Sequence, residues 1–228
     1  MKKWDNLPEF MKKEEVRPYY EALEKHRAGL AVKRMLDILF SLILFVILLP
    51  FMILIGILVG VTSKGGVFFC QERITAYGRS FKIIKFRTMV SDAEKRGSQV
   101  TTSGDSRVTA IGRFLRKVRL DELPQLINIL KGEMSIVGTR PEVPRYVDQY
   151  TPRMMATLLL PAGVTSKASI AYKDEERLLS AGDDVDKIYV EQVLPEKMEY
   201  NLAYLLEFSV GQDLKLMIQT VLAVFRTA

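Results

Sequence analysis

One uncharged stretch, from Ile38 to Val61, constrains the fold of this chain more than any other part. It reads ILFSLILFVILLPFMILIGILVGV and contains no charged side chain. As one straight helix it would reach about 36 Å, enough to cross a hydrocarbon core of about 30 Å. It begins too far along the chain for a cleavable signal peptide and lacks a small-residue cleavage site. The stretch is therefore predicted to lie in a membrane, and its length alone permits a single spanning helix.

A proline and the flanking charges favour a different arrangement. Pro50 stands near the middle of the stretch, where it removes one backbone hydrogen bond and kinks a helix. The halves on either side would each be about 17 Å long, too short to cross but long enough to enter and return. Lys33 and Arg34 precede the stretch and Lys64 and Arg73 follow it, so both ends are expected on the cytoplasmic side. We therefore predict a proline-broken, re-entrant helix hairpin that enters one leaflet.

The chain divides into three parts around this hairpin. Residues 1–30 form a polar, charged leader, 31–63 the re-entrant membrane helix, and 64–228 a domain on the cytoplasmic side. The leader is either a short interfacial helix or a solvated extension, and the sequence favours neither.

Charge and composition limit the partners of the chain. Lys and Arg number 33 against 27 Asp and Glu, a formal net charge of +6. This balance suits a phospholipid surface, a phosphorylated substrate or nucleic acid. Nucleic acid is the least favoured, because no zinc-finger, helix-turn-helix or aromatic RNA-binding signature is present. The single cysteine, Cys70, excludes an internal disulfide, and the single histidine, His26, argues against a His-based metal site or triad.

The first part of the domain is predicted to form a β-hairpin. Stretches 67–75 and 80–89 read as strands around a turn at 76–79. In the second strand Lys85 and Arg87 alternate onto one face, so the two cations are expected to point the same way.

The rest of the domain is predicted to be mostly helical, which gives a helix-rich α+β fold. After a loop at 91–106, apolar residues recur at helical spacing from Val108 to Val118, with Arg113 on another face. A second helix is expected through Leu123–Leu130, ending at Gly132.

A further apolar stripe lies near the C-terminus, at Leu214, Met217, Ile218, Val221, Leu222 and Phe225. Core packing is the more usual reason for such a stripe, and a position in the membrane interface beside the hairpin is the alternative.

The adjacent carboxylates Asp121 and Glu122, in LDELPQL (120–126), are the candidate catalytic pair. In mid-helix they would diverge by about 100°, but at a helix start they can share one target. Asp121 suits an N-cap or first-turn position, and Pro124 is tolerated there. A carboxylate beside a positive helix end stays ionised and can attack phosphorus or hold Mg²⁺. Taken alone, an Asp-Glu dipeptide is more commonly a helix cap followed by a solvated glutamate.

The surrounding sequence favours the catalytic interpretation of the pair over the helix cap. LDELPQLINILKGEMSIVGTRPE (120–142) resembles the catalytic signature of the bacterial sugar transferases, the monotopic phosphoglycosyl transferases. The resemblance covers roughly residues 30–226 and includes an ordered series of further motifs. These are KRxxD (Lys33, Arg34, Asp37), the break at Pro50, KFRTM (85–89), DSRVTxxGRFLR (105–116) and DLKLMIQT (213–220).

The resemblance implies a reaction and a place for it. Members of the family move a sugar phosphate from a nucleoside diphosphate sugar, here expected to be a UDP-sugar, to a polyprenyl (undecaprenyl) phosphate. Asp121 matches the nucleophile that forms a sugar-phosphoryl aspartate and expels UMP, and Glu122 matches the partner carboxylate that binds Mg²⁺ with it. Residues 64–228 would then be a small catalytic domain with interfacial amphipathic helices. It would lie on the cytoplasmic face of the bacterial inner membrane, where it starts the synthesis of a surface glycan such as exopolysaccharide or lipopolysaccharide.

Several cations are candidates to bind substrate phosphates. Arg87 can meet phosphate in a bidentate way and Lys85 adds a point charge on the same face. Arg140 lies in a tight turn, VGTRPE, where Glu142 would orient it, and Arg113 is a further candidate.

The KRxxD residues are assigned to the membrane boundary. Lys33 and Arg34, beside Asp37, are more readily explained by anchoring on lipid headgroups than by catalysis.

The donor-recognition region departs from the family pattern. Many members have a PGITG-type segment where this chain has Pro161–Ser166, followed here by ASIAYKDEERLL (168–179) and LPEK (194–197). Four side chains there, Lys173, Glu175, Glu176 and Lys197, either bind substrate or form a surface salt-bridge network. Arg119 also replaces a small residue before LDEL. The sugar therefore stays open, as does a homodimer.

Two other interpretations of the chain remain. One is a basic, membrane-anchored glycan-assembly factor without catalysis. The other is an ordinary spanning protein with an exported domain.

Overall fold

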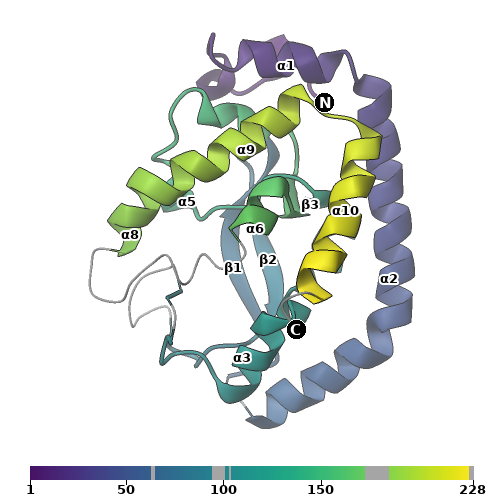
Figure 1. Cartoon of the computed structure of the whole chain (residues 1–228), viewed down its shortest axis with the longest axis vertical. Helices are drawn as coiled ribbons and strands as arrows, with labels where there is room; N and C mark the ends of the chain where they lie inside the picture. The colour runs from purple at the N-terminus through teal and green to yellow at the C-terminus, as the bar shows by residue number, and fades with distance from the viewer. Residues whose placement is uncertain (63–64, 94–100, 103, 173–184, 226–228) are drawn as a thin grey trace.

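Helix α2, Arg27–Thr62, is the longest element of the chain (Figure 1). The structure is a computed structural model, and it describes residues 1–62, 65–93, 101–102, 104–172 and 185–225. Within these ranges α2 is the one helix long and apolar enough to cross a membrane. Ile47 is 65% exposed, Phe51 62% and Val61 83%. A soluble surface rarely carries so long an apolar face, and a lipid environment accounts for it.

Pro50 lies inside α2, and the helix continues on both sides of it. Figure 1 shows that the C-terminal part of α2 leaves the line of the N-terminal part and passes toward α3 (Ala110–Lys117). The described helix is therefore bent rather than divided into two halves, because a proline removes one hydrogen bond and kinks a helix without forcing a turn. The re-entrant topology predicted for residues 31–63 stays a prediction.

Two small sheets form the β part of the fold. Strands β1 (Phe68–Ile74) and β2 (Ser80–Phe86) are antiparallel and in register from Phe68↔Phe86 to Ile74↔Ser80, which confirms the predicted hairpin. The second sheet pairs β3 (Met134–Val137) in parallel with β4 (Ala162–Thr165). The sequence did not predict this second sheet.

Helices surround these sheets. The predicted helix from Val108 is α3, which Thr109 caps by accepting a hydrogen bond from the Gly112 amide at 3.0 Å. The next helix, α4 (Gln125–Lys131), ends at Gly132, whose φ of 81° is left-handed, as predicted. The remaining helical elements are η1 (Trp4–Asn6), η2 (Glu9–Met11), α1 (Arg17–Glu24), η3 (Ala76–Gly78), η5 (Leu120–Glu122), α5 (Pro144–Val147), η6 (Met154–Leu159), α6 (Lys167–Ala171), α8 (Val185–Ile188), η7 (Tyr189–Val193), α9 (Leu194–Leu206) and α10 (Val210–Phe225).

The leader belongs to the main hydrophobic core. Met11, Val16 and Leu23 are fully buried and share one cluster with side chains of η6 and α9. Figure 1 shows α1 lying across the end of the molecule, beside the start of α2. The alternative of a solvated extension is therefore wrong. The leader alternates short 3₁₀ turns with one short helix, so its apolar residues follow no single period that the sequence could reveal.

The KRxxD side chains tie α2 to the domain. Lys33 Nζ donates to Asp213 Oδ2 and to the Val137 carbonyl, both at 2.7 Å, and Lys33 is 6% exposed. Asp37 accepts from the Ser135 hydroxyl at 2.7 Å and the Ile136 amide at 3.0 Å.

Arg34 completes this connection by closing the end of α4. Its guanidinium donates to the Ile129 carbonyl at 2.7 Å and the Leu130 carbonyl at 3.1 Å, in the last turn of the helix, where carbonyls have few intrahelical partners. The predicted anchoring of Lys33 and Arg34 on lipid headgroups is therefore wrong. Both cations find acceptors within the protein, on segments far away in the sequence.

The Lys33–Asp213 pair gives a stability prediction. Asp213→Ala leaves a buried ammonium without its carboxylate, and we expect a loss of about 3–5 kcal/mol in the free energy of unfolding. The double variant Lys33→Met/Asp213→Leu should recover most of that loss, because no charge is left unpaired. Urea unfolding of the purified protein in detergent measures both, with the exposed Asp148→Ala as control. If Asp213→Ala unfolds at the wild-type urea concentration, the pair contributes nothing.

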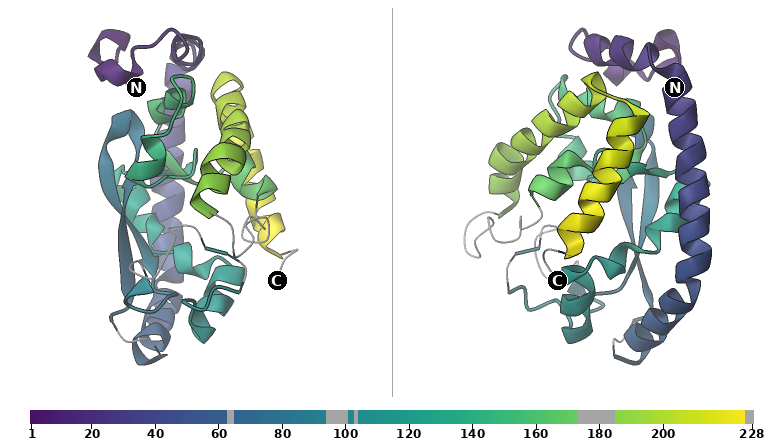
Figure 2. Two further views of the ribbon diagram at one scale, coloured as in Figure 1. Left: turned by 90° about the vertical axis from the view of Figure 1, so that its left-hand side faces the viewer. Right: turned by 45° about the vertical axis from the view of Figure 1, so that its right-hand side comes forward.

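The C-terminal stripe is mostly exposed, although Met217 packs against the main core cluster. Leu214, Ile218, Val221 and Leu222 on α10 are 39% to 63% exposed, whereas Asp213 and Leu216 of the same helix are buried. Core packing is therefore wrong for these four side chains. Figure 1 and the right-hand view of Figure 2 show α10 beside the N-terminal part of α2, and the two helices are in contact. A position of α10 in the membrane interface stays a prediction.

Candidate active site

The acidic pair lies in η5, a single 3₁₀ turn between α3 and α4. Arg119, with a left-handed φ of 57°, ends the run of α3 and redirects the chain into this turn. Leu123 and Pro124 then keep right-handed helical angles up to Gln125. The pair is therefore at a helix start, as predicted. Of the two predicted positions, N-cap or first turn, Asp121 takes the first turn, since Arg119 is the N-cap of η5 and Pro124 that of α4.

Three cations converge on one oxygen of Glu122. Arg140 Nη2 lies 2.6 Å from Oε1, Lys85 Nζ 3.0 Å and Arg119 Nη1 3.6 Å. Glu122 is 8% exposed. Burial by itself would raise the pKa of Glu122, but Arg140, Lys85 and Arg119 outweigh burial and hold this pKa well below its usual range. Glu122 therefore stays ionised, and its carboxylate pairs with three cationic side chains.

Asp121 has the opposite environment. It is 6% exposed, and its Oδ1 has no hydrogen-bond partner among the described residues. Burial raises the pKa of Asp121 and the charge of Glu122 raises it further, while Lys85, Arg116 and Arg119 act against both. Neighbouring carboxyl groups whose pKa values are pushed apart are a common feature of catalytic sites. An ionised Asp121 here is poorly solvated and is available as a nucleophile.

The other predicted cations divide into two groups. Lys85, on β2, joins the site, and burial lowers its pKa while Glu122 acts against this. Arg87 follows the end of β2, and its guanidinium donates to the Phe68 carbonyl at 3.2 Å. Arg113 is an exposed residue of α3. The described contacts do not bring these two to Glu122, and their phosphate-binding roles stay predictions.

Arg119 is a member of the site to which the sequence reasoning gave no role. Its motif marks it only as a replacement for a small residue, yet its guanidinium approaches Glu122 and its side chain is 42% exposed. The i,i+3 spacing between Arg119 and Glu122 on a helical turn was the available signal.

The turn that carries Arg140 is held from both ends. Before it, Gly138 lies against Gly163 of β4, so closely that a Cβ on Gly163 would stand 2.1 Å from the Gly138 nitrogen. After it, Arg73 donates to the Pro141 carbonyl at 3.0 Å. This clamping fixes the backbone from which Arg140 reaches Glu122.

The described contacts of the Glu142 carboxylate are with Tyr189 and Arg73, and none joins it to Arg140, which it was predicted to orient. Glu142 accepts a hydrogen bond from the Tyr189 hydroxyl at 2.6 Å, and Lys197 Nζ donates to the same hydroxyl at 3.2 Å. Lys197 is 5% exposed, so a surface salt bridge is wrong for this residue. The other three candidates of that group, Lys173, Glu175 and Glu176, lie outside the described residues.

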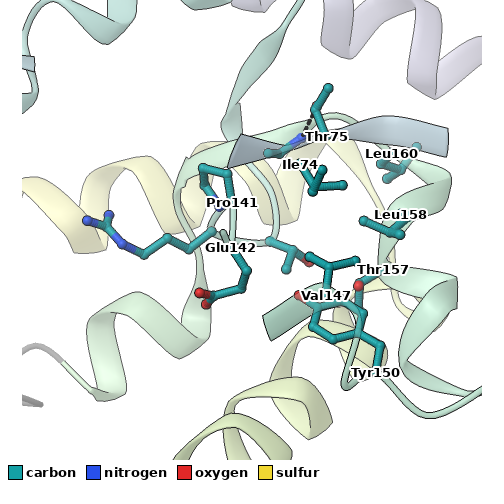
Figure 3. Close-up of a pocket in the computed structure, with 12 residues that line it drawn as sticks. Ile74, Thr75, Pro141, Glu142, Val147, Tyr150, Thr157, Leu158 and Leu160 are labelled. Atoms are coloured by element: carbon teal, nitrogen blue, oxygen red, sulfur yellow. Dashed lines mark hydrogen bonds between the residues drawn. The ribbon is translucent and has the colours of Figure 1, made fainter. Parts of the chain in front are cut away.

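A small cavity adjoins the Arg140 turn. Figure 3 shows its apolar side, with Leu158 and Leu160, and the carboxylate of Glu142 at another edge. Burial raises the pKa of Tyr150, which also lines it, well above the usual value. Asp121 and Glu122 are not among the lining residues. The cavity therefore supports the turn and does not contain the acidic pair.

Asp121 and Glu122 could contribute to a metal site but not complete one. Among the described residues, no group of three or more His, Cys, Asp or Glu side chains could hold a metal ion. Oε1 of Glu122 is taken by cations, whereas Oε2 has one contact, to Arg140 Nη1 at 3.5 Å. Oε2 and the carboxylate of Asp121 are the oxygen donors that fit Mg²⁺, which commonly adds substrate phosphates to one or two carboxylates.

Comparison with known proteins gives one clear family match. The family model described as "Bacterial sugar transferase" matches residues 28–227. An N-acetylgalactosaminephosphotransferase of Aeromonas hydrophila, named as using UDP-N-acetylgalactosamine and undecaprenyl phosphate, is 34% identical over 193 residues, 83% of this chain and 43% of that protein.

Two further relatives are also named as transferases that use undecaprenyl phosphate. A putative undecaprenyl-phosphate N-acetylgalactosaminyl 1-phosphate transferase of Bacillus subtilis is 45% identical over 127 residues, 56% of this chain and 71% of that protein. A UDP-glucose:undecaprenyl-phosphate glucose-1-phosphate transferase of Escherichia coli is 35% identical over 195 residues, 83% of this chain and 39% of that protein. The chain thus spans well under half the length of the A. hydrophila and E. coli relatives.

Proposed function

Because this chain belongs to the bacterial sugar transferase family, we propose that it transfers a sugar 1-phosphate from a UDP-sugar to undecaprenyl phosphate and so initiates a surface glycan. The observation that carries the proposal is the buried Asp121, with one oxygen unpaired, beside a Glu122 that gathers Lys85, Arg119 and Arg140. Phosphoryl transfer needs little beyond an aligned nucleophile and neutralised charge, and this arrangement supports both roles.

The proposed reaction has two steps. First, a carboxylate oxygen of Asp121 attacks the phosphorus that bears the sugar, the bond from that phosphorus to the bridging oxygen breaks, and UMP leaves with the electron pair. Second, an oxygen of undecaprenyl phosphate attacks the same phosphorus and Asp121 leaves as a carboxylate. Two steps let one site serve a soluble donor and a lipid acceptor in turn. Arg119, the most exposed of the three cations, is placed to meet the incoming diphosphate.

We propose Mg²⁺ as the cofactor. Asp121 and Oε2 of Glu122 would hold it together with the diphosphate, where it would neutralise charge on the departing UMP.

A nucleotide-release screen tests the function. Purified full-length protein in detergent, with Mg²⁺ and undecaprenyl phosphate, is offered a panel of UDP-sugars, and UMP is measured. We expect one or a few sugars to release UMP, and a donor labelled in its sugar to leave label bound to the protein when the acceptor is omitted. A glycan-assembly factor without catalysis would release no UMP from any donor.

The membrane arrangement is part of the proposal. We place α2 in the cytoplasmic leaflet of the bacterial inner membrane, with both of its ends on the cytoplasmic side. Cys70, the single cysteine of the chain, is exposed on β1 and reports the location of the end that follows α2. Glu9→Cys in a Cys70→Ser background reports the location of the end that precedes α2. In intact cells a membrane-impermeant maleimide should label neither cysteine, and it should label both after lysis. Labelling of one cysteine in intact cells would show a spanning helix.

The pH profile should depend on Lys85. Because burial raises the pKa of Asp121 and only its ionised form attacks, turnover should fall as the pH drops through that raised pKa. Lys85 lowers this pKa by its charge, so in Lys85→Met the acidic limb should move to higher pH and turnover should fall about 10²-fold.

The matched control for Lys85→Met is Lys82→Met, a residue of the same strand with an exposed side chain. UMP release measured from pH 5 to 9 should give the wild-type profile for this control. If the acidic limb of Lys85→Met stays at the wild-type pH, Lys85 does not lower the pKa of Asp121.

A further inference from the structure

Gln125 is a buried polar side chain next to the acidic pair with no part in the two steps above. It is the first residue of α4 and is 1% exposed. Within the described residues, its amide nitrogen and its amide oxygen both lack a hydrogen-bond partner, as does Oδ1 of Asp121. Native proteins satisfy nearly all buried polar groups, so an unsatisfied carboxamide indicates a functional reason for keeping it.

The backbone keeps Gln125 close to the pair. From η5 through Leu123 and Pro124 into α4 the chain keeps right-handed helical angles. Side chains three and four residues apart on a helical turn are neighbours, with about 5–6 Å between Cβ atoms. A helical side chain also leans toward the N-terminal end of its helix. Gln125 therefore lies about one helical turn beyond Asp121 and Glu122.

Of the two carboxylates, Asp121 is the one with an oxygen that can accept a further hydrogen bond. Glu122 already accepts from Lys85 and Arg140 and lies near Arg119. Oδ1 of Asp121 is buried and unpaired, and the Gln125 amide carries two unpaired donors. Donor and acceptor thus belong to residues four positions apart, and both are buried.

We propose that Gln125 is a positioning residue whose side-chain amide donates a hydrogen bond to the non-attacking oxygen of Asp121 during the reaction. This inference rests on the proposed function. When the other oxygen of Asp121 bonds to phosphorus, the non-attacking oxygen becomes the carbonyl oxygen of the aspartyl intermediate. When undecaprenyl phosphate attacks, the P–O bond to Asp121 breaks and its electron pair returns to the carboxylate, which shares the new charge with that oxygen.

The hydrogen bond should favour the second step most. A donor binds a carboxylate oxygen more strongly than a carbonyl oxygen, so the amide stabilises Asp121 as it becomes the leaving group. A neutral amide also leaves the nucleophile ionised without adding a further charge. The first step should be less affected, because there the same hydrogen bond weakens as the carboxylate is consumed.

The test uses Gln125→Met, an uncharged side chain of the same length. Full-length protein in detergent is assayed with the UDP-sugar that the wild type uses, labelled in its sugar, with undecaprenyl phosphate. We expect turnover to fall about tenfold or more, the fraction of protein carrying covalent label during turnover to rise, and Tm to stay equal or increase. Gln149→Met, an exposed glutamine, is the control and should match the wild type.

A second variant distinguishes a specific loss of turnover from a loss caused by misfolding. Gln125→Glu keeps the shape but adds a carboxyl, which should raise the pKa of Asp121 and shift the acidic limb of turnover to higher pH. Wild-type turnover in Gln125→Met, or a loss of turnover that follows a fall in Tm without extra covalent label, overturns the inference. If the wild type itself releases no UMP from any donor, the proposed function fails instead, which separates the two outcomes.

Discussion

Replacing Asp121 with asparagine should lower the rate of UMP release by on the order of 10³-fold or more, because an amide cannot act as the nucleophile. The fold should persist, since asparagine has the same shape and removes a carboxylate whose pKa burial raises. Removing a poorly solvated charge of this kind commonly keeps or increases stability. Tm should therefore stay equal or rise while turnover is lost.

Two measurements check this expectation. The first is UMP release with the UDP-sugar that the wild type uses, and the second is covalent label on the protein when undecaprenyl phosphate is omitted. Asp148→Asn, an exposed aspartate, is the matched control and should behave like the wild type in both. Full turnover of Asp121→Asn, or undiminished label on it, would falsify the assignment of the nucleophile.

The second large effect is expected from Gly163→Ala, at a position that carries no charged group of the site. A Cβ there would stand 2.1 Å from the nitrogen of Gly138 and 2.3 Å from its oxygen. These are backbone atoms, so no side-chain rotation can relieve the overlap, and β3 and β4 must separate. Overpacking of this kind lowers the free energy of unfolding by about 1–3 kcal/mol or more.

Because Arg140 lies two residues beyond Gly138, Gly163→Ala should also reduce turnover. At about 2–4 °C of Tm per kcal/mol for a domain of this size, thermal unfolding detects the loss of stability. Gly211→Ala is the matched control, since a Cβ on Gly211 would have nothing within 4 Å of it and alanine favours the helix there. If Gly163→Ala equals Gly211→Ala in both Tm and turnover, the close approach of the two strands is not needed for the site.

The sequence predicted the elements whose signal is local. Alternation along β2 buries Phe81 and Ile83 and turns Lys85 toward the acidic pair. Helical spacing found α3, and Gly132 marked the end of α4. The acidic pair itself was recognised from its motif, because two adjacent carboxylates alone do not distinguish a site from a helix cap.

The second sheet and the role of Lys33 were missed for one physical reason, which is that the partners lie far away in the chain. The strands of the second sheet are four residues each, and their parallel pairing of Met134 with Ala162 leaves no local pattern. Lys33 next to an apolar helix has the pattern of a headgroup anchor, because its acceptors, Val137 and Asp213, come more than 100 residues later. Only folding brings such groups together.

Because α2 is rigidly attached to β3, the depth of α2 in the lipid sets the distance of Asp121 from the membrane. Lys33 and Asp37 fix the position of α2 along its own axis against Val137 and Ser135, and the Arg140 turn follows directly from that strand. The apolar half of the helix therefore stands at a set height and rotation from Asp121. Inserting one residue after Asp37 would advance that half by about 1.5 Å and turn it by about 100°. Such an insertion would also turn Met52, Ile55 and Val59 out of the cluster that they form with Leu120 and Leu123, the residues on either side of the acidic pair. The depth of the helix in the lipid and the packing of the site would therefore change together.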